Sequence, residues 1–415
     1  MTGPAPRGGT GNSATAADVA GGPDYRQFTR WTFTALLILT QVPSVFAFTI
    51  PLPLLAAMAR DLAHDPANAY LAKMISGVLG PAMALGAASG GWLADKFDRR
   101  WLLIAISSLY VVSGIAPAVL SALGVIVAAR FCTGLAAGAL ATIGMTMVGD
   151  YLPEAKRAGT IGMLSAVNMI GSVVTLPTAG WVGDAGWRAA FFLYLLAAPV
   201  IVLASLRSLP VPVRPAARSR QAVGKRQWSV GLPMGLILLA IAVGIILTIP
   251  GIYISFHLAT IGLGKASTVG LLMMLNSLIA AVTSAMFGKA WRRSPRAVFC
   301  CGFGTMTAGL FLLALGTGYP VVIPALLMMG TGMGLLAPSV MARVVDIVAE
   351  GRRGQSVGFA NFILALAPLF GITLLEPLMP EIGTRGVILT IGALSAISFA
   401  AFALPRTAKP VPAPG

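Results

Sequence analysis

Residues 101–129 read WLLIAISSLYVVSGIAPAVLSALGVIVAA and contain no charged side chain. About 20 apolar residues in a helix cross the ~30 Å hydrocarbon core of a bilayer. Because lipid offers no hydrogen-bond partners to the backbone, a segment that crosses it must fold as a helix or join a closed barrel, and this length suits a helix. The stretch therefore predicts a membrane-spanning helix.

Stretches of the same kind recur along the whole chain. The longest of them is interrupted by Gly316-Thr317-Gly318-Tyr319-Pro320, a sequence of turn-forming residues that divides it into two spans. We therefore expect twelve membrane-spanning helices. The uncharged windows are 31–59, 74–94, 101–129, 131–149, 158–183, 189–206, 227–264, 266–288, 297–342, 354–375 and 386–405.

The overall composition also indicates an integral membrane protein. Of the 415 residues, 57% are hydrophobic and 10% are charged, and the mean hydropathy is +0.86. A soluble protein carries about 25% charged residues, so this chain cannot cover a water-facing surface of its own size. Soluble enzymes are excluded, and no Gly-x-x-x-x-Gly-Lys-Ser/Thr loop for binding phosphate is present. We expect a protein that is not an enzyme.

The charges are distributed unequally between the two sides of the predicted membrane. Lysine and arginine number 29 against 13 acids, a net charge of +16. If both termini are cytoplasmic, 23 of the basic residues lie on that side, which is the bias that orients membrane proteins. This explains the charge without a nucleic-acid partner and predicts a multi-pass protein of a bacterial-type inner (plasma) membrane. The six exceptions are Arg60, Lys73, Arg130, Arg188, Lys265 and Arg385.

The chain divides into two halves of six spans each. Residues 1–29 and 405–415 lack apolar runs and are predicted to be cytoplasmic tails, the first of them disordered. Residues 208–230 are basic and rich in proline, as expected of a cytoplasmic linker. The predicted bundles are residues 30–207 and residues 231–404.

The second half resembles the first at an offset of 196 residues. Gly134 and Gly138 align with Gly330 and Gly334 without a gap. The chain is therefore predicted to be a duplicated six-helix unit, and such duplications place a transport pathway between the halves. The same offset also pairs Asp150 with Asp346, Glu154 with Glu350, Lys156 with Arg352, Arg157 with Arg353 and Gly162 with Gly358.

Three motifs point to a known family. The loop after the second span reads Gly91-Trp-Leu-Ala-Asp95-Lys-Phe-Asp98-Arg99-Arg100, and the fourth span contains Arg130-Phe-Cys-Thr-Gly134-Leu-Ala-Ala-Gly138. Gly186-Trp187-Arg188 precedes the sixth span. Together they resemble the major facilitator superfamily, most closely its drug/proton antiporter branch, although Asp98 replaces the usual second glycine of the first motif. The resemblance implies an all-α membrane fold of two pseudo-symmetric six-helix bundles, with transport by alternating access.

The first motif acts as a conformational latch in that family. Here Asp95 could face the positive N-terminus of the eleventh span near Gly354, and Arg99 could pair with Asp150. Such contacts would hold the halves together when the cavity opens outward. For Arg100, ordinary loop charge is an equal alternative. The predicted gating residues are Gly91, Asp95, Arg99, Arg100 and Asp150.

Arg130 is the basic residue deepest within a predicted span. An arginine within lipid is costly and normally faces a cavity or a partner. We expect it to shape a polar cavity, attract a substrate anion or couple to protonation. The alternative is that its side chain extends to the outer interface.

Several polar side chains are candidates for a central cavity, with interhelical packing as the alternative for each asparagine. No carboxylate lies in the first span, so the buried titratable side chains that are candidates for proton coupling are His257, Asp346 near the inner end of the tenth span, and Glu376. At 1.5 Å per residue, Glu376 is expected at the outer interface rather than the centre. The remaining cavity candidates are Gln41, Asn168, Tyr253, Phe256, Asn276 and Asn361, with His257 again.

These observations predict a secondary transporter that moves a small, amphipathic organic molecule out of the cell in exchange for protons. The alternative is proton-coupled uptake of an organic anion or metabolite, and a transport-inactive sensor or scaffold is a third possibility. We expect a monomer whose partners are its small-molecule substrate and the lipid bilayer. The three cysteines and two histidines have no metal-ligand spacing, so neither a metal nor a cofactor is expected.

Overall fold

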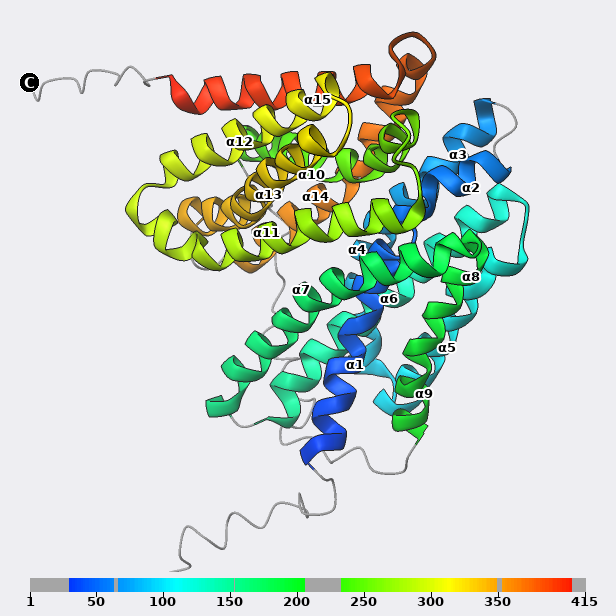
Figure 1. The fold of residues 1–415 in the computed structure, drawn as a ribbon. Helices are drawn as coiled ribbons and strands as arrows, with labels where there is room; N and C mark the ends of the chain where they lie inside the picture. Colours follow the sequence, from blue (N-terminus) through cyan, green and yellow to red (C-terminus); the bar gives the residue numbers. More distant parts are fainter. Residues whose placement is uncertain (1–29, 63–65, 153, 206–232, 349–352, 405–415) are drawn as a thin grey trace, which may run out of the picture.

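The computed structural model describes residues 30–62, 66–152, 154–205, 233–348 and 353–404. The predicted tails and the whole of the predicted linker, residues 208–230, lie outside the described residues. Within the described part of the chain, the regular structure is helical throughout. Figure 1 shows the helices gathered into two bundles, the first drawn in blue to green and the second in green to red.

The helices of the first bundle follow one another with short connections. They are α1 (Arg30–Thr49), η2 (Leu52–Leu54), α2 (Leu55–Leu62), α3 (Pro66–Gly77), α4 (Leu79–Lys96), α5 (Arg99–Val119), α6 (Leu123–Tyr151), α7 (Glu154–Asp184), α8 (Trp187–Ala190), η3 (Phe191–Ala197) and α9 (Ala198–Ser205). The second bundle contains α10 (Met234–Thr260), α11 (Ala266–Arg293), α12 (Pro295–Leu315), α13 (Tyr319–Ile347), α14 (Arg353–Leu375), η7 (Glu376–Leu378) and α15 (Met379–Ala403).

The described residues contain eleven apolar helical stretches long enough to cross a membrane. The last of these, Ser356–Ala403, has 48 residues and would measure about 72 Å as a straight helix. It contains α14, η7 and α15, and the chain reverses direction between α14 and α15 (Figure 1). It therefore accounts for two crossings, and the total is the predicted twelve. The predicted break at Gly316–Pro320 separates α12 from α13, where Gly318 has a φ of 81° that suits glycine.

The sequence repeat corresponds to a repeat in packing. Gly134 and Gly138 let α6 approach α4 so closely that an added Cβ at Gly138 would overlap the carbonyl oxygen of Met83. Gly330 and Gly334 bring α13 against α11 in the same way, and the carbonyl oxygen that meets Gly334 belongs to Ala280. Small residues allow membrane helices to pack backbone to backbone. The duplicated glycines therefore build the same helix pair in each bundle.

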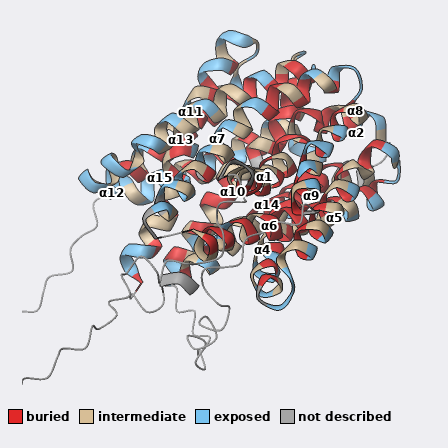
Figure 2. Ribbon diagram, turned by 90° about the horizontal axis from the view of Figure 1, so that it is seen from below, coloured by how far each residue is buried: buried red, intermediate tan, exposed pale blue. Residues whose placement is uncertain are grey.

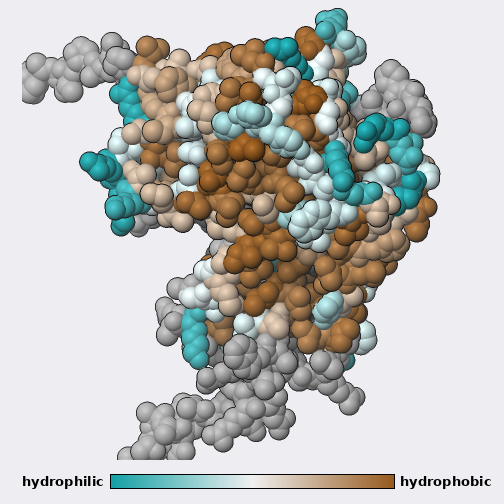
Figure 3. All heavy atoms as spheres, viewed as in Figure 1, coloured by the Kyte–Doolittle hydropathy of each residue, from teal (hydrophilic) through white to brown (hydrophobic). Residues whose placement is uncertain are grey.

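The two bundles meet at one end and separate toward the other. We call the side at which α1 begins and α15 ends the terminal side, and the opposite side the far side. The bundles touch where α7 packs on α11 and where α3 and α4 pack on α14, which is the same pairing exchanged between the repeats. In Figure 1, α7 and α11 diverge toward the terminal side, and Figure 3 shows a hollow between the bundles there.

The buried residues lie where helices of the same bundle face each other. Figure 2 shows buried residues concentrated inside the bundles and exposed residues at the turns and on outward-facing helix surfaces. Many exposed side chains are large and apolar, among them Trp101, Trp181, Phe370 and Ile397. Figure 3 shows apolar residues over the middle of both bundles and hydrophilic residues mainly at helix ends. This distribution is that of a multi-pass membrane protein, whose outer surface contacts lipid.

Candidate functional site

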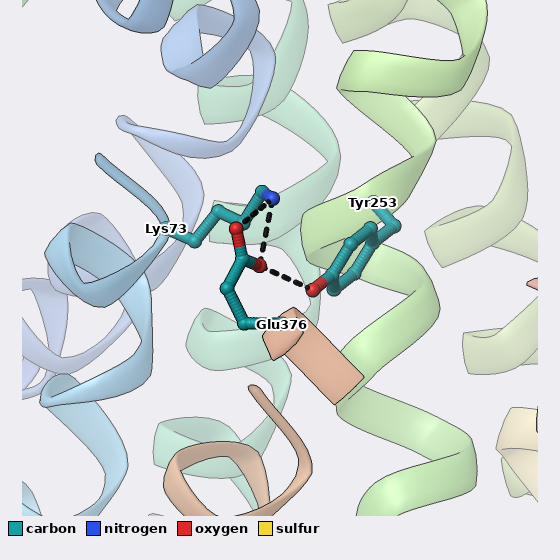
Figure 4. Close-up of polar contacts among 3 residues, drawn as sticks. All are labelled: Lys73, Tyr253 and Glu376. Atoms are coloured by element: carbon teal, nitrogen blue, oxygen red, sulfur yellow. Dashed lines mark hydrogen bonds and ion pairs between the residues drawn. The ribbon is translucent and has the colours of Figure 1, made fainter. Parts of the chain in front are cut away.

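The two bundles are joined at the far side by a buried ion pair (Figure 4). Lys73 on α3 places its Nζ 2.6 Å from Oε1 and 2.7 Å from Oε2 of Glu376, the first residue of η7. The hydroxyl of Tyr253 on α10 donates to Oε2 at 3.0 Å. The carboxylate therefore accepts from both bundles at once.

This site is enclosed by aromatic rings and is largely shielded from water. The side chains of Lys73 and Glu376 are 5% and 14% exposed. The Lys73 Nζ lies 5.2 Å from the ring centroid of Tyr253 and 5.6 Å from that of Phe256. Attraction to the ring faces offsets part of the cost of burying the ammonium group. Removing one partner of such a pair costs about 3–5 kcal/mol, because a buried charge is left alone.

A second ionic contact joins the bundles at α7 and α11. Asp184 at the end of α7 accepts a hydrogen bond from the backbone N–H of Ser267 at 3.1 Å, and its Oδ2 lies 3.5 Å from the Nζ of Lys265. Asp184 thus supplies a negative charge to the N-terminus of a helix in the other bundle, which is a favourable position for a carboxylate. The Lys265 side chain is 71% exposed, so this pair is open to water.

The repeat relates the buried pair to two glycines. Gly134 lies against the carbonyl oxygen of Leu79, and its repeat partner Gly330 lies against that of Asn276. Leu79 and Asn276 are therefore equivalent, and the offset between α4 and α11 is 197 residues. The backbone stays helical across Val78, between α3 and α4, so the same offset matches Lys73 with Gly270. The offset of 196 on α7 and α14 matches Glu376 with Gly180. The ion pair therefore occupies the positions that glycines hold in the other contact.

At those two glycine positions, the contact between α7 and α11 closes without charge. An added Cβ at Gly180 would overlap the carbonyl oxygen of Ala266, and one at Gly270 would overlap that of Leu176. Both helices therefore touch through their backbones. The contact of α4 with α14 has one such approach, between Gly80 and the carbonyl oxygen of Ala365, and the ion pair lies beyond it toward the far side.

Two further hydrogen bonds join the bundles at the far side. The hydroxyls of Tyr70 on α3 and Thr373 on α14 lie 3.4 Å apart, and the Ser255 hydroxyl on α10 donates to the carbonyl oxygen of Leu52. The far side is thus held together by polar contacts from both bundles. The hollow in Figure 3 lies on the terminal side, so the bundles are joined at one side and separated at the other.

The structure brings together three of the residues that the sequence singled out: Tyr253, Phe256 and Glu376. Lys73, which completes the site, was not predicted as a site residue. The sequence signals for it were its place among the six basic residues outside the cytoplasmic set and its position beside the apolar window 74–94, where the repeat has glycine. Glu376 lies at the far-side end of its helix, as expected, although its side chain is mostly buried.

The four amide candidates for the cavity are dispersed. The Gln41 amide on α1 is buried and donates to the carbonyl oxygen of Ala141, and the Asn276 amide donates to that of Leu326 at 2.9 Å. These two join neighbouring helices of one bundle. Asn168 bonds within α7, and Asn361 is an exposed residue of α14.

Two candidates for proton coupling lie away from the bundle contact. His257 is buried, and its Nε2 lies 3.0 Å from the carbonyl oxygen of Leu313 in the same bundle, while its Nδ1 has no partner. Asp346 is exposed at the terminal-side end of α13, so the prediction that it is buried was wrong. A carboxylate at a helix end stays in contact with water, and this is why the Asp346 side chain is exposed.

Arg130 meets its partners inside the first bundle, and its predicted roles toward a substrate anion or a proton stay predictions. Its residue exposure is 0%, so it neither lines an open cavity nor extends to the interface. Its Nη1 donates to the hydroxyl of Tyr194 at 2.6 Å, and its Nη2 donates to the carbonyl oxygen of Ala47. The arginine therefore joins α6 to α1 and η3 inside the first bundle, because a guanidinium can satisfy several acceptors at once.

The predicted contact of Arg99 with Asp150 is present, and Arg99 also lies 5.4 Å from the ring of Tyr151. Both charged residues belong to the first bundle, so this pair cannot join the halves as the latch hypothesis requires. Gly91 and Asp95 lie on the last turns of α4, and the Asp95 side chain is outside the described residues. The guanidinium of Arg100 lies 5.8 Å from the ring of Trp101.

Comparison with known proteins agrees with this architecture. The family model described as Major Facilitator Superfamily matches residues 37–372 and again residues 263–415. The chain belongs to the major facilitator superfamily. Its helices superpose on those of the nucleoside transporter NupG with a TM-score of 0.72 at 13% identity, over 89% of this chain and 98% of that one.

The relatives in sequence include the following two. A probable sugar efflux transporter of Helicobacter acinonychis is 24% identical over 79% of this chain and 84% of its own length. A cis,cis-muconate transport protein of Acinetobacter baylyi is 31% identical over 41% of this chain and 42% of its own. The family consists of transporters, and this superfamily member is a membrane transporter and not an enzyme.

Proposed function

We propose that this superfamily member is a secondary active transporter that moves a small organic molecule by alternating access between its two bundles. The observation that carries the proposal is the unequal closure of the two sides. Hydrogen bonds and ion pairs join the bundles at the far side, and the hollow between them lies at the terminal side. With both termini in the cytoplasm, as the charge distribution favours, this is the inward-open state.

The finer proposal is proton-coupled efflux of an amphipathic molecule across a bacterial-type inner membrane. Exposed methionines Met145, Met286 and Met333 provide adaptable apolar surface of the kind that accepts varied ligands. A relative that covers most of the chain is named as a sugar efflux transporter. The protein is proposed to act as a monomer, since each chain contains both halves of the pathway.

Transport by everted membrane vesicles tests this proposal. Vesicles that contain the protein should accumulate an amphipathic compound when their interior is acidified, and a protonophore should abolish the uptake. Vesicles without the protein provide the background. No proton-driven accumulation across a panel of amphipathic amines, sugars and neutral drugs would contradict efflux.

The second candidate is proton-coupled uptake of an organic anion, and the buried Lys73 favours it. This cation lies at the boundary of the bundles and is held by a carboxylate that a substrate carboxylate could replace. The muconate-transporting relative carries a dicarboxylate, according to its name. Arg130, the cation first considered for this role, is enclosed in its own bundle.

Counterflow in proteoliposomes separates the two candidates. Uptake of anions predicts exchange of labelled dicarboxylates such as muconate at acidic pH, with competition from other carboxylates and none from amines. Exchange of amines without any exchange of carboxylates would favour efflux. A protein that exchanges neither and shows one fixed conformation would be a sensor or scaffold.

A further inference from the structure

The ion pair between Lys73 and Glu376 breaks the symmetry of the two bundle contacts. We propose that Glu376 is the proton-binding site of the transporter, and that its protonation opens the far side at α3 and α14 while α7 and α11 stay in contact as the hinge. The inference rests on the proton coupling proposed above. It applies equally to efflux and to uptake.

Closure of the far side does not require a charge at these positions. The equivalent contact closes through Gly180 and Gly270, whose backbones meet carbonyl oxygens of the opposite bundle. A buried ion pair adds little net stability compared with apolar packing, because both ions lose their hydration. Lys73 and Glu376 therefore provide what Gly180 and Gly270 lack, which is a carboxylate that can accept a proton.

A proton on Glu376 removes the attraction that holds the site closed. In the structure the carboxylate accepts two contacts from Lys73 and one from Tyr253. The neutral carboxyl group no longer balances the buried ammonium, whose attraction is strong where water is excluded. The proton comes from water at the far side, Lys73 keeps its own proton, and the ammonium must regain water. Separation of α3 from η7 supplies that water.

The groups around Glu376 favour this residue over its neighbours as the switch. On α3 the facing groups are Lys73 and Tyr70, and on α10 they are Tyr253 and His257, whose ring is turned to Leu313 of α12. Residues 356–375 of α14 carry no ionisable side chain. On α15 the charged residues next to η7 are Glu381 and Arg385, both exposed. Among the described residues, Glu376 is the acid in direct contact with a cation of the other bundle at this contact.

The other inter-bundle acid is suited to a hinge rather than a switch. Asp184 keeps a backbone hydrogen bond from Ser267 whatever the state of Lys265, which is exposed. Loss of that exposed ion pair has little effect, because water screens it. The glycine contacts beside it also hold α7 against α11. A tilt about this line would separate α3 from α14.

This mechanism gives the same first step to both candidate functions. An acidic far side protonates Glu376 and opens the transporter there, which admits an external substrate or releases one that came from the cytoplasm. Loss of the proton from Glu376 restores the pair with Lys73 and closes the far side. The pH of the far side thus acts on the gate directly, before any substrate binds.

Spin-label distances measure this response without a substrate. In a background lacking Cys132, Cys300 and Cys301, one pair of labels at Arg60 and Leu378 reports on the gate. A second pair at Ala185 and Thr260 reports on the hinge. All four positions are exposed, and the two positions of each pair lie on opposite bundles. Samples are equilibrated at pH 8 and pH 5 before freezing.

We expect the gate distance to lengthen at pH 5 and the hinge distance to stay constant. Glu376→Gln should give the long gate distance at both pH values, and the matched control Asp184→Asn should behave as the parent protein does. The exchange Lys73→Glu with Glu376→Lys should restore the short distance at pH 8 and its response to pH. A pH response that persists in Glu376→Gln, or an equal lengthening of the hinge, would overturn the inference.

Failure of the inference and failure of the proposed function have different signatures. A gate that responds to pH through Glu376 in a protein that transports none of the tested compounds leaves the inference standing and removes the proposed efflux or uptake. Proton-driven transport with a gate that ignores Glu376 does the reverse. If Glu376→Gln does not fold, the labelled parent protein and the charge-exchanged variant still decide the outcome.

Discussion

Lys73 on α3 and Gly270 on α11 occupy equivalent positions in the two halves of a duplicated chain. The first ends in an ion pair with Glu376, and the second lies against the carbonyl oxygen of Leu176. The two bundle contacts have therefore diverged in chemistry while keeping the same geometry. One is a charge pair that protons can alter, and the other is a contact between backbones.

Substitution at Gly270 tests the backbone contact between α7 and α11. Gly270→Ala should destabilise the protein, because the new Cβ overlaps the carbonyl oxygen of Leu176 and the helices must move apart. Overpacking of this kind costs about 1–3 kcal/mol. The measurement is the free energy of unfolding of the purified protein in an SDS titration.

Gly288→Ala is the matched control on the same helix, since nothing lies within 4 Å of an added Cβ there. Alanine stabilises a helix interior relative to glycine by roughly 0.5–1 kcal/mol, so this variant should be as stable as the parent or more stable. Equal losses for the two variants would show that Gly270 makes no special contact.

The fold could be predicted from the sequence because the lipid restricts the choices. Long uncharged windows must be helices, and the repeated Gly134 and Gly330 required both halves to have the same packing. The fusion of α14 and α15 into one apolar stretch did not hide their separation, since Glu376, Glu381 and Arg385 interrupt the uncharged windows. The pattern of uncharged windows along the chain therefore predicted the number of helices.

Replacement of Arg130 tests whether this residue is structural in its own bundle. Arg130→Lys keeps the charge but cannot reach both the Tyr194 hydroxyl and the carbonyl oxygen of Ala47. Loss of a hydrogen bond to a buried charged group costs about 1.5–3 kcal/mol, so we expect lower stability by that amount. Unfolding in SDS measures it.

Arg293→Lys, at an exposed arginine of α11, is the control and should change stability by less than about 0.5 kcal/mol. Arg130→Lys with unchanged stability but weakened substrate binding would instead return Arg130 to the transport pathway. A loss of stability without a change in affinity agrees with the contacts seen here.

The site was only partly predictable, and Arg130 and Lys73 show why. Both are basic residues in or beside apolar helices, and the sequence contains no information on which neighbour each one meets. Arg130 finds Tyr194 from 64 residues away, and Lys73 finds Glu376 from 303 residues away. Pairing over such separations depends on how the bundles close. By contrast, Arg99 begins α5 and Asp150 lies at the end of α6, so both charges are at neighbouring ends of two helices that follow each other in the chain, and their contact could be anticipated.

Asp98, which stands where the family motif has glycine, caps α5. Its carboxylate caps α5 by accepting hydrogen bonds from the N–H groups of Arg100 at 2.9 Å and Trp101 at 3.3 Å. Asp98→Ala should lower stability by about 1 kcal/mol, and Asp98→Gly by a few tenths. Amide hydrogen exchange at the first turn of α5 should rise in the alanine variant. Asp98→Asn keeps an acceptor and should leave exchange unchanged, and faster exchange in that variant would argue against capping.

Arg296 holds the end of the last helix against α12. Its Nε donates to the carbonyl oxygen of Phe402 at 2.8 Å, and its Nη2 donates to those of Ala403 and Leu404 at 2.8 and 2.9 Å. The last carbonyls of a helix have no partner within the helix, so this guanidinium supplies what the helix lacks. Phe402 also stacks on Phe299 with ring centroids 4.4 Å apart.

Arg296→Gln should therefore fray the end of α15 without unfolding the bundle. We expect amide exchange at residues 400–404 to accelerate, because opening of this turn no longer breaks three hydrogen bonds, each worth about 1 kcal/mol or more. Exchange within α12 and α13 should stay unchanged, since the aromatic stack persists. Arg292→Gln, at an exposed arginine on the same side, is the control. Acceleration of equal size in both variants would mean that the loss of positive charge, and not of the three donors, loosens the helix end.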